Sequence, residues 1–425
     1  MATEALIDLE KFLASEWDPD LTVGEWWEKL GVEGWSAPDW DPAWYGRGLS
    51  RSDGTSVALA IKRHRALPAP GGLGLMLAGP TIAAHGTDDQ KRSYLRDIVT
   101  GQRSWCQLFS EPGAGSDLAG VSCSAVLDGD EWCINGQKVW TSAAQVCDMG
   151  MLLARTNPDV PKHQGLSWFA FEMRQPGVVV RALREMTGRS VFNEVFLDDA
   201  VAPVGALLGG RDRGWTVATT TLMNERAGLT AGGHSAGSLA SAGQLAGDLA
   251  RRAGDFTVSP KRRTGDALAY INDAAARVTE LAVRMGRAED PLVRQQLAHL
   301  YTLVNLGRYN GLRAKAGGSK AVPGHGNIDK LTMSDIGRRC RDLSLSLLGP
   351  TGTLYPYNKE QSIALAEQVG DFALVGETAL FASAVSIFGG TDEIQRNILS
   401  ERVLGLPKDP HDVKAVPFRD LPRNG

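Results

Sequence analysis

The chain has 425 residues, of which 45 are Lys or Arg and 49 are Asp or Glu, so its formal net charge is −4. This balance does not suggest the clustered basic surface of a nucleic-acid-binding protein, and no run approaches the ~18 apolar residues that indicate a membrane span. Since one hydrophobic core rarely grows beyond about 300 residues, the length predicts two or three domains.

The first 104 residues are expected to form a helical domain. Residues 34–50 are rich in Trp, Pro and Gly, which indicates a loop. Thr87 is expected to cap a helix over residues 87–99, because its hydroxyl can accept from a first-turn N–H and acidic residues follow it.

Residues 105–205 are expected to form a β domain. Apolar and β-branched residues alternate over residues 123–141, as half-buried strands require. Asp128-Gly129 and Asn135-Gly136 are both predicted hairpin turns, because these residue types tolerate a positive φ. Further strands are expected over residues 167–173 and 191–199.

From residue 206 to the end the apolar period is again helical. Thr391 is expected to begin a last helix, with Asp392 and Glu393 in its first turn. The tail after Pro407 has several prolines and no period, so it is predicted to be an extended arm. The expected fold class is α+β, with domains over residues 1–104, 105–205 and 206–425.

The cysteines and histidines favour neither disulfides nor a metal site. The five cysteines contain no CxxC pair, and the seven histidines form no HExxH or Cys/His cluster. The amino terminus lacks the basic start and apolar centre of a signal peptide. We therefore expect a cytoplasmic protein with free thiols.

Two motifs carry the functional signal: QLFSEPGAGSDLAG over residues 107–120 and GQKVWTS over residues 136–142. The glycine spacing differs from the GxGxxG dinucleotide fingerprint. Together the motifs resemble the acyl-CoA dehydrogenase family, as do residues 84–95, 186–203 and 388–407. The resemblance implies an N-terminal helical domain, a middle β-barrel-like domain and a C-terminal four-helix bundle. It also implies FAD, an acyl-CoA substrate oxidised between its α and β carbons, and an electron-transfer flavoprotein as acceptor.

The resemblance also assigns binding residues. To the binding of FAD it assigns Gln107, Phe109, Ser110, Gly115, Ser116, Trp140, Thr141, Ser142, Thr391 and Glu393. Near the acyl-CoA it places Ser116, Arg226, Gly389 and Gly390. Glycines allow close backbone approach, and hydroxyl or N–H donors stabilise a reduced flavin.

The catalytic base is expected to be Glu225. Many family members carry the base as a Glu in the C-terminal loop, where this chain has Gly389. The long-chain and isovaleryl branches also have Gly there, and their base lies on the first long helix after the β domain. Glu225 in TTLMNERAGLTAGG matches that position. A carboxylate enclosed there would be desolvated, which raises its pKa toward a useful range.

Two departures from the family affect the partner predictions. The Arg-x-x-Phe-Gly motif that reaches FAD from a neighbouring subunit is not recognisable, and the Gly-Gly-Asn-Gly loop appears as Gly349-Pro350-Thr351-Gly352. A homo-oligomer, most simply a tetramer, is expected, and a heteromer remains open. The alternatives are a non-catalytic or half-catalytic subunit of a heteromer and a flavin-dependent oxidase. The shape of the acyl group is not encoded in these motifs.

Overall fold

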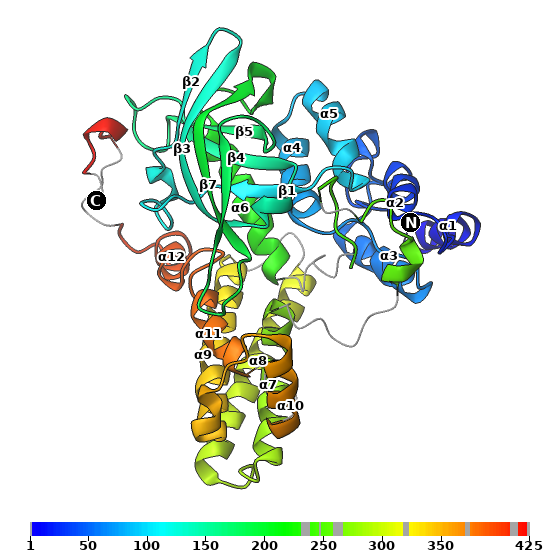
Figure 1. Ribbon diagram of the computed structural model, residues 1–425, viewed down its shortest axis with the longest axis vertical. Helices are drawn as coiled ribbons and strands as arrows, with labels where there is room; N and C mark the ends of the chain where they lie inside the picture. Colours follow the sequence, from blue (N-terminus) through cyan, green and yellow to red (C-terminus); the bar gives the residue numbers. More distant parts are fainter. Residues whose placement is uncertain are drawn as a thin grey trace. The chain divides into compact units, whose positions relative to one another are not determined.

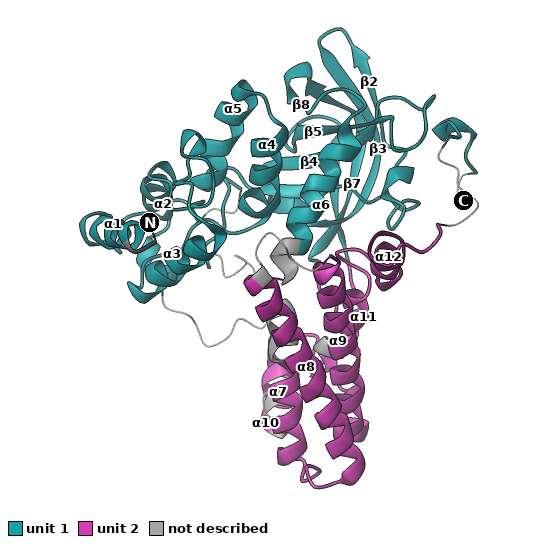
Figure 2. Ribbon diagram, turned by 180° about the vertical axis from the view of Figure 1, so that it is seen from behind, with its two compact units in different colours: residues 1–183, 190–260, 411–425 teal, residues 184–189, 261–410 magenta. Residues whose placement is uncertain are grey.

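The computed structural model describes residues 2–230, 239–245, 248–257, 267–317, 323–369, 375–408 and 415–422. Internal contacts divide the chain into two compact units (Figure 2). The first contains residues 1–183, 190–260 and 411–425, and the second contains residues 184–189 and 261–410. The N-terminal helices and the sheet thus belong to one unit, and the division into three domains stays a prediction.

The N-terminal region is helical, as predicted. Thr87 caps the helix that follows it, accepting from the N–H of Gln90 at 3.3 Å, while the Gln90 side chain accepts from the N–H of Thr87 at 3.0 Å. The helices are α1 (Ala2–Glu16), α2 (Val23–Val32), α3 (Arg51–Arg63), a π-helical turn η2 (Gly74–Ala78), α4 (Gly79–His85) and α5 (Asp88–Val99).

A segment from later in the chain completes the core of these first helices. Trp26 and Trp27 are fully buried there, together with Ala253. The N–H of Val23 donates to Arg251 O at 2.8 Å, and that of Gly24 donates to Leu249 O at 2.9 Å. Residues 248–257 therefore lie beside the start of α2.

Eight strands form one sheet, in the order β6-β7-β3-β2-β4-β5-β8, and β1 pairs in parallel with β4 (Figure 1). The predicted strands at 167–173 and 191–199 correspond to β5 and β7. The bounds are β1 (Trp105–Leu108), β2 (Ser124–Asp128), β3 (Glu131–Ser142), β4 (Met149–Arg155), β5 (Leu166–Glu172), β6 (Val178–Leu183), β7 (Phe192–Pro203) and β8 (Leu207–Leu208).

One of the two predicted hairpin turns is confirmed and the other is wrong. Gly129 has φ 61° in the connection between β2 and β3. Asn135 and Gly136 instead lie inside β3, which continues in order to pair with β7. A Cβ on Gly136 would lie 2.7 Å from the Cα of Cys123, so Gly136 serves close strand approach rather than a turn.

Helix α6 (Gly214–Thr230) covers one face of the sheet. It packs against β4 and β5 and against η2 and α4. Val217, Ala218 and Thr221 are buried in that contact. The Oγ1 atoms of Thr221 and Thr81 are 3.0 Å apart, which joins α6 to α4.

The second unit is a helical bundle, which agrees with the expected α+β fold class. Helices α7 (Ala267–Arg284), α8 (Pro291–Gly317), α9 (His325–Leu348) and α11 (Val375–Val385) pack together (Figure 2). Helices α10 (Lys359–Val369) and α12 (Asp392–Ile398) complete it. Thr391 caps α12 as predicted, accepting from the N–H of Ile394 at 3.2 Å.

The described part of the tail, residues 415–422, is bound to the first unit. Pro417 forms a β-bridge with Pro161, and the N–H of Phe418 donates to Val160 O at 2.9 Å. The guanidinium of the buried Arg155 lies 3.7 Å from the centre of the Phe418 ring. The predicted arm is thus anchored by backbone and cation–π contacts.

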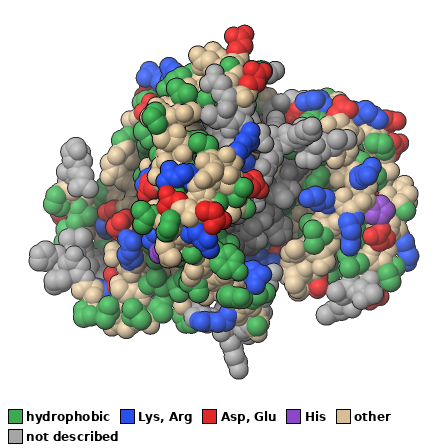
Figure 3. Space-filling view, turned by 90° about the horizontal axis from the view of Figure 1, so that it is seen from below, with side chains coloured by type: hydrophobic (Ala, Val, Ile, Leu, Met, Phe, Trp, Pro, Cys, Tyr) green, Lys and Arg blue, Asp and Glu red, His purple; other side chains and the backbone are tan. Residues whose placement is uncertain are grey.

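The surface agrees with the charge balance of the sequence. Over the face drawn in Figure 3, basic side chains lie among acidic and apolar ones rather than in a single patch. Within the described ranges, no helix is long and apolar enough to cross a membrane.

Candidate functional site

The two sequence motifs meet on the first unit. Residues 107–120 begin in β1 and continue as a loop, and residues 136–142 form the second half of β3. The N–H of Val139 donates to Ser110 O at 2.9 Å, which joins the segments directly. Glu111 and Ala114 exchange two backbone hydrogen bonds of 3.0 Å, so the loop turns tightly just beyond this contact.

A buried ion pair fixes the two segments to each other. The Nζ of Lys138, which is fully buried, lies 2.8 Å from Glu111 Oε1 and donates to Phe109 O at 3.1 Å and to Leu153 O at 2.7 Å. Burial opposes the charge on Glu111, but Lys138 and two backbone N–H donors hold the pKa of Glu111 below its usual value. Glu111 therefore stays ionised inside the protein.

Three consecutive residues at the end of β3 face different directions. Trp140 is 57% exposed and has φ 60°, which is unusual for a non-glycine residue and occurs here at a strand irregularity. Thr141 is buried, and its hydroxyl has no hydrogen-bond partner among the described residues. Ser142 is half-buried. Trp140 and Ser142 therefore present side chains outward, and Thr141 does not.

These features fit a flat, polar ring such as the flavin. An exposed indole can cover such a ring, and the half-buried Ser110 and Ser142 supply hydroxyl donors. Gly115 has open space where a Cβ would be, and Ser116 beside it is exposed. Phe109 is buried in the core, so it can serve a bound ring only through its backbone.

Glu225 lies on α6, within reach of the first motif. The Nε2 of Gln107 donates to Glu225 Oε2 at 3.4 Å. The side chain is half-buried, but protein atoms surround the carboxyl group closely. This desolvation raises the pKa of Glu225, and the Gln107 amide and the Arg226 charge oppose the rise without cancelling it. A carboxyl group of this kind suits a general base.

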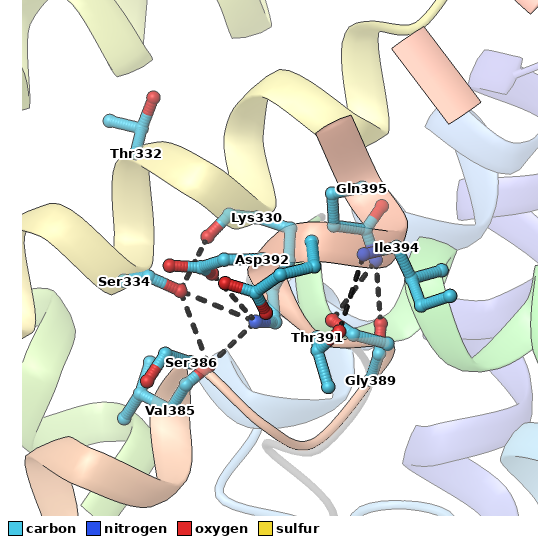
Figure 4. Close-up of polar contacts among 12 residues, drawn as sticks. Lys330, Thr332, Ser334, Val385, Ser386, Gly389, Thr391, Asp392, Ile394 and Gln395 are labelled. Atoms are coloured by element: carbon cyan, nitrogen blue, oxygen red, sulfur yellow. Dashed lines mark hydrogen bonds and ion pairs between the residues drawn. The ribbon is translucent and has the colours of Figure 1, made fainter. Parts of the chain in front are cut away.

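The loop that carries Gly389 and Gly390 lies in the second unit and is held by side chains of α9 and α12 (Figure 4). The buried Lys330 donates from Nζ to Val385 O at 2.6 Å. Gln395 Nε2 donates to Gly389 O at 3.0 Å and to Gly390 O at 3.1 Å. Both ends of the loop are therefore fixed by side chains rather than by regular structure.

Acidic residues next to this loop have different surroundings. Arg338 Nη1 donates to Asp392 Oδ2 at 2.7 Å, and Lys330 Nζ lies 3.8 Å from the other carboxylate oxygen. Burial opposes the charge of Asp392, but its hydrogen bonds and the two cations lower its pKa. Glu393 is exposed and lies 3.5 Å from Arg396.

The structure brings some predicted site residues together within the first unit, and others belong to the second unit. Gln107 contacts Glu225, and the segment that holds Trp140 and Ser142 contacts Ser110's backbone. The predicted residues in the second unit are Gly389, Gly390, Thr391 and Glu393, and their place in one site with the others stays a prediction. Within the described ranges, no group of His, Cys, Asp and Glu could hold a metal ion.

Sequence reasoning did not single out Lys138 and Glu111, although both lie inside the two motifs. A signal was present. The period of two that places Trp132 and Ile134 inside the sheet also places Lys138 there, and a buried lysine requires an acidic partner. Glu111 is the only acidic residue in the first motif before its glycines.

Three family models match the chain. They describe the acyl-CoA dehydrogenase N-terminal domain over residues 8–102, the middle domain over residues 106–200 and the C-terminal domain over residues 262–404. Acyl-CoA dehydrogenase IpdE1 of Mycobacterium tuberculosis (strain ATCC 25618 / H37Rv) is 35% identical over 384 residues, covering 90% of this chain and 88% of the relative.

Solved structures share the fold. A steroid ACAD, Tcur3481-Tcur3483, has a TM-score of 0.67 at 24% identity, covering 96% of this chain and 98% of that chain. The ChsE4-ChsE5 complex from Mycobacterium tuberculosis has a TM-score of 0.65 at 24% identity, with the same coverage. The family models and the 35% identical relative show that the chain belongs to the acyl-CoA dehydrogenase family. Its members are FAD-dependent oxidoreductases that act on the CH–CH bond of an acyl-CoA.

Proposed function

We propose that this chain dehydrogenates an acyl-CoA thioester between its α and β carbons, with Glu225 as the base that removes the α proton. The observation that carries the proposal is the placement of Glu225. Its carboxyl group is desolvated, and it contacts Gln107 at the start of the motif expected at the flavin. A base with a raised pKa beside the cofactor segment is what α-proton abstraction requires.

The chain's own residues have distinct roles in this proposal. FAD held at this site would supply the acceptor for the hydride that leaves the β carbon. Trp140, Ser142 and the backbone of residues 107–110 hold the ring, and the Lys138–Glu111 pair fixes the strand and loop that carry them. Ser116 and Arg226 are proposed to contact the CoA part of the substrate.

The test combines product analysis with one substitution. The purified protein, mixed without oxygen with straight, branched and steroid acyl-CoA thioesters, should bleach its flavin with one of them and yield a product lacking two hydrogens. Glu225→Gln should keep FAD and lose most of this activity, whereas Glu360→Gln, an exposed glutamate on α10, should not. A panel that bleaches no flavin, in a protein that retains FAD, would contradict the proposed activity.

We propose a cytoplasmic homo-oligomer, most simply a tetramer, that passes its electrons to an electron-transfer flavoprotein. Light scattering tests the oligomeric state, and a monomer at working concentration would contradict it. Reoxidation of the bleached flavin by purified electron-transfer flavoprotein, but not by air at a comparable rate, is expected. Rapid reoxidation by air would favour the flavin-dependent oxidase.

A second candidate is a subunit of a heteromeric dehydrogenase. It is supported by the unrecognisable Arg-x-x-Phe-Gly motif, which in the family reaches FAD from a neighbouring subunit. In that case the chain alone would lose FAD on purification and would retain it when co-expressed with the product of a neighbouring gene. Retention of FAD by the chain alone would favour the homo-oligomer.

A further inference from the structure

Gln107 is a polar residue on an otherwise apolar row of the sheet. Side chains alternate along β1 and into the loop, so Trp105, Gln107 and Phe109 share one face while Cys106 and Leu108 share the other. Trp105 and Phe109 are buried in the same core cluster. That cluster also contains residues of α6, the helix that covers this face. An amide in such a row requires a polar partner.

The partner comes from the covering helix. Along α6, Ala218, Thr221 and Leu222 follow at helical spacing on the face toward the sheet, and Glu225 is the next residue of that stripe. Its Oε2 atom receives the hydrogen bond from Gln107 Nε2 at 3.4 Å. Gln107, the polar side chain between Trp105 and Phe109, thus contacts the carboxylate of the helix that packs over them.

We infer that Gln107 is a positioning residue for the base: its amide N–H holds one carboxylate oxygen of Glu225 and leaves the other for the substrate's α proton. The inference rests on the proposed function of Glu225. It differs from the role that the family resemblance implies, in which Gln107 belongs to the flavin site. The backbone of residues 107–110 remains available to the cofactor.

The residue type matches this task. A neutral donor favours the ionised form of the carboxyl group, which is the form that accepts a proton, without adding a charge to the site. A glutamate at position 107 would instead place a like charge beside Glu225 and oppose its ionisation. A leucine or methionine of similar size would fill the space and supply no donor.

Among the residues that the structure describes, few other charges act on Glu225. Burial raises the pKa of Glu225, while Gln107 and then Arg226 lower it. The titratable groups on the other elements that pack against α6 contact groups other than Glu225. His85 of α4 lies 2.7 Å from the hydroxyl of Thr220, and the remaining groups, Arg155 of β4 and Glu172 of β5, contact Lys162 O and Arg103.

The experiment measures anaerobic flavin reduction by a competent acyl-CoA across pH. Gln107→Leu and Gln107→Met should keep FAD and its visible spectrum. Without the donor the pKa of Glu225 rises, so the acid limb of the rate profile should move to higher pH. The loss of rate should be about 3- to 10-fold larger at pH 6 than at pH 9, the size of one hydrogen bond. Gln107→Glu should move the limb further in the same direction.

The controls separate this inference from the proposed function. Gln361→Leu removes an exposed glutamine of α10 and should leave the profile unchanged. If Glu225→Gln is inactive but the Gln107→Leu profile superimposes on the parent, the inference is wrong and the proposed function stands. If Gln107→Leu and Gln107→Met both lose FAD, Gln107 serves the cofactor and the inference is again wrong. If Glu225→Gln reduces flavin like the parent, both fail.

Discussion

Replacing Lys138 by Met should destabilise the protein more than any surface substitution of a lysine. Lys138 is fully buried and donates to Glu111 and to two backbone carbonyl groups. Met fills a similar volume without a charge. The substitution therefore leaves the Glu111 carboxylate buried with its backbone donors but without its cation.

The expected cost follows from that uncompensated charge. Breaking a buried ion pair by removing one partner costs about 3–5 kcal/mol. The sign of the pH dependence follows from Glu111, whose pKa is held below its usual value in the folded protein. Such a group stabilises the fold above its unfolded pKa, and that contribution disappears as the pH falls through the folded pKa. In Lys138→Met the Glu111 carboxylate is buried without its cation. The loss of unfolding free energy should therefore be largest at neutral pH and should shrink as acid protonates Glu111.

The assay is urea unfolding followed by tryptophan fluorescence, at pH 7 and at the lowest pH at which the protein refolds. Lys29→Met is the matched control, because Lys29 makes an ion pair of 2.6 Å with Glu16 while both side chains are about 40% exposed. Solvent screens that pair, so its loss should have a much smaller effect. Equal effects of the two substitutions at pH 7, or a Lys138→Met cost that grows toward low pH, would refute this reasoning.

Three further predictions concern the loop and the tail. Lys330→Met should lower the unfolding free energy by about 1.5–3 kcal/mol, the value of a hydrogen bond from a charged group, and a melting temperature equal to the parent's would contradict it. Gly390→Ala should lower the unfolding free energy by about 1–3 kcal/mol, because the φ of Gly390 is 85° and a Cβ there would lie 2.5 Å from a side-chain nitrogen. Gly205→Ala, where a Cβ has open space, should leave the unfolding free energy unchanged. Phe418→Ala removes the ring beside Arg155, so it should lower the unfolding free energy by about 0.5–2 kcal/mol and expose the tail to protease. An unchanged digestion pattern would show that the tail is anchored elsewhere.

The helices and most strands could be predicted because their signals are local. Thr87 and Thr391 cap the helices that the sequence predicts to begin at them. The turn predicted at Asn135-Gly136 is wrong because strand pairing overrides the local preference. β3 continues across the dipeptide to pair with β7, and Gly136 allows the neighbouring strand to approach closely. A local turn preference is weak against a continuous ladder of backbone hydrogen bonds.

The residues of the candidate site could be proposed from the sequence, but the contacts among them could not. The motifs and the resemblance pointed to Gln107, Trp140, Ser142 and Glu225 as a group. That Gln107 reaches Glu225 depends on how α6 crosses the sheet, which is a long-range property of the packing. The buried state of Thr141 likewise follows from the irregular register between β3 and β7, not from residue type.

The most direct test of the account is the rate at which a competent acyl-CoA reduces the flavin of Glu225→Gln after rapid anaerobic mixing. Gln keeps the size of the side chain and cannot accept the α proton. If Glu225 is the base, the variant keeps the parental FAD content and its rate is about 10²- to 10⁴-fold below the parent, the usual value of a general base. A Glu225→Gln protein that reduces its flavin as fast as the parent would show that the base lies elsewhere.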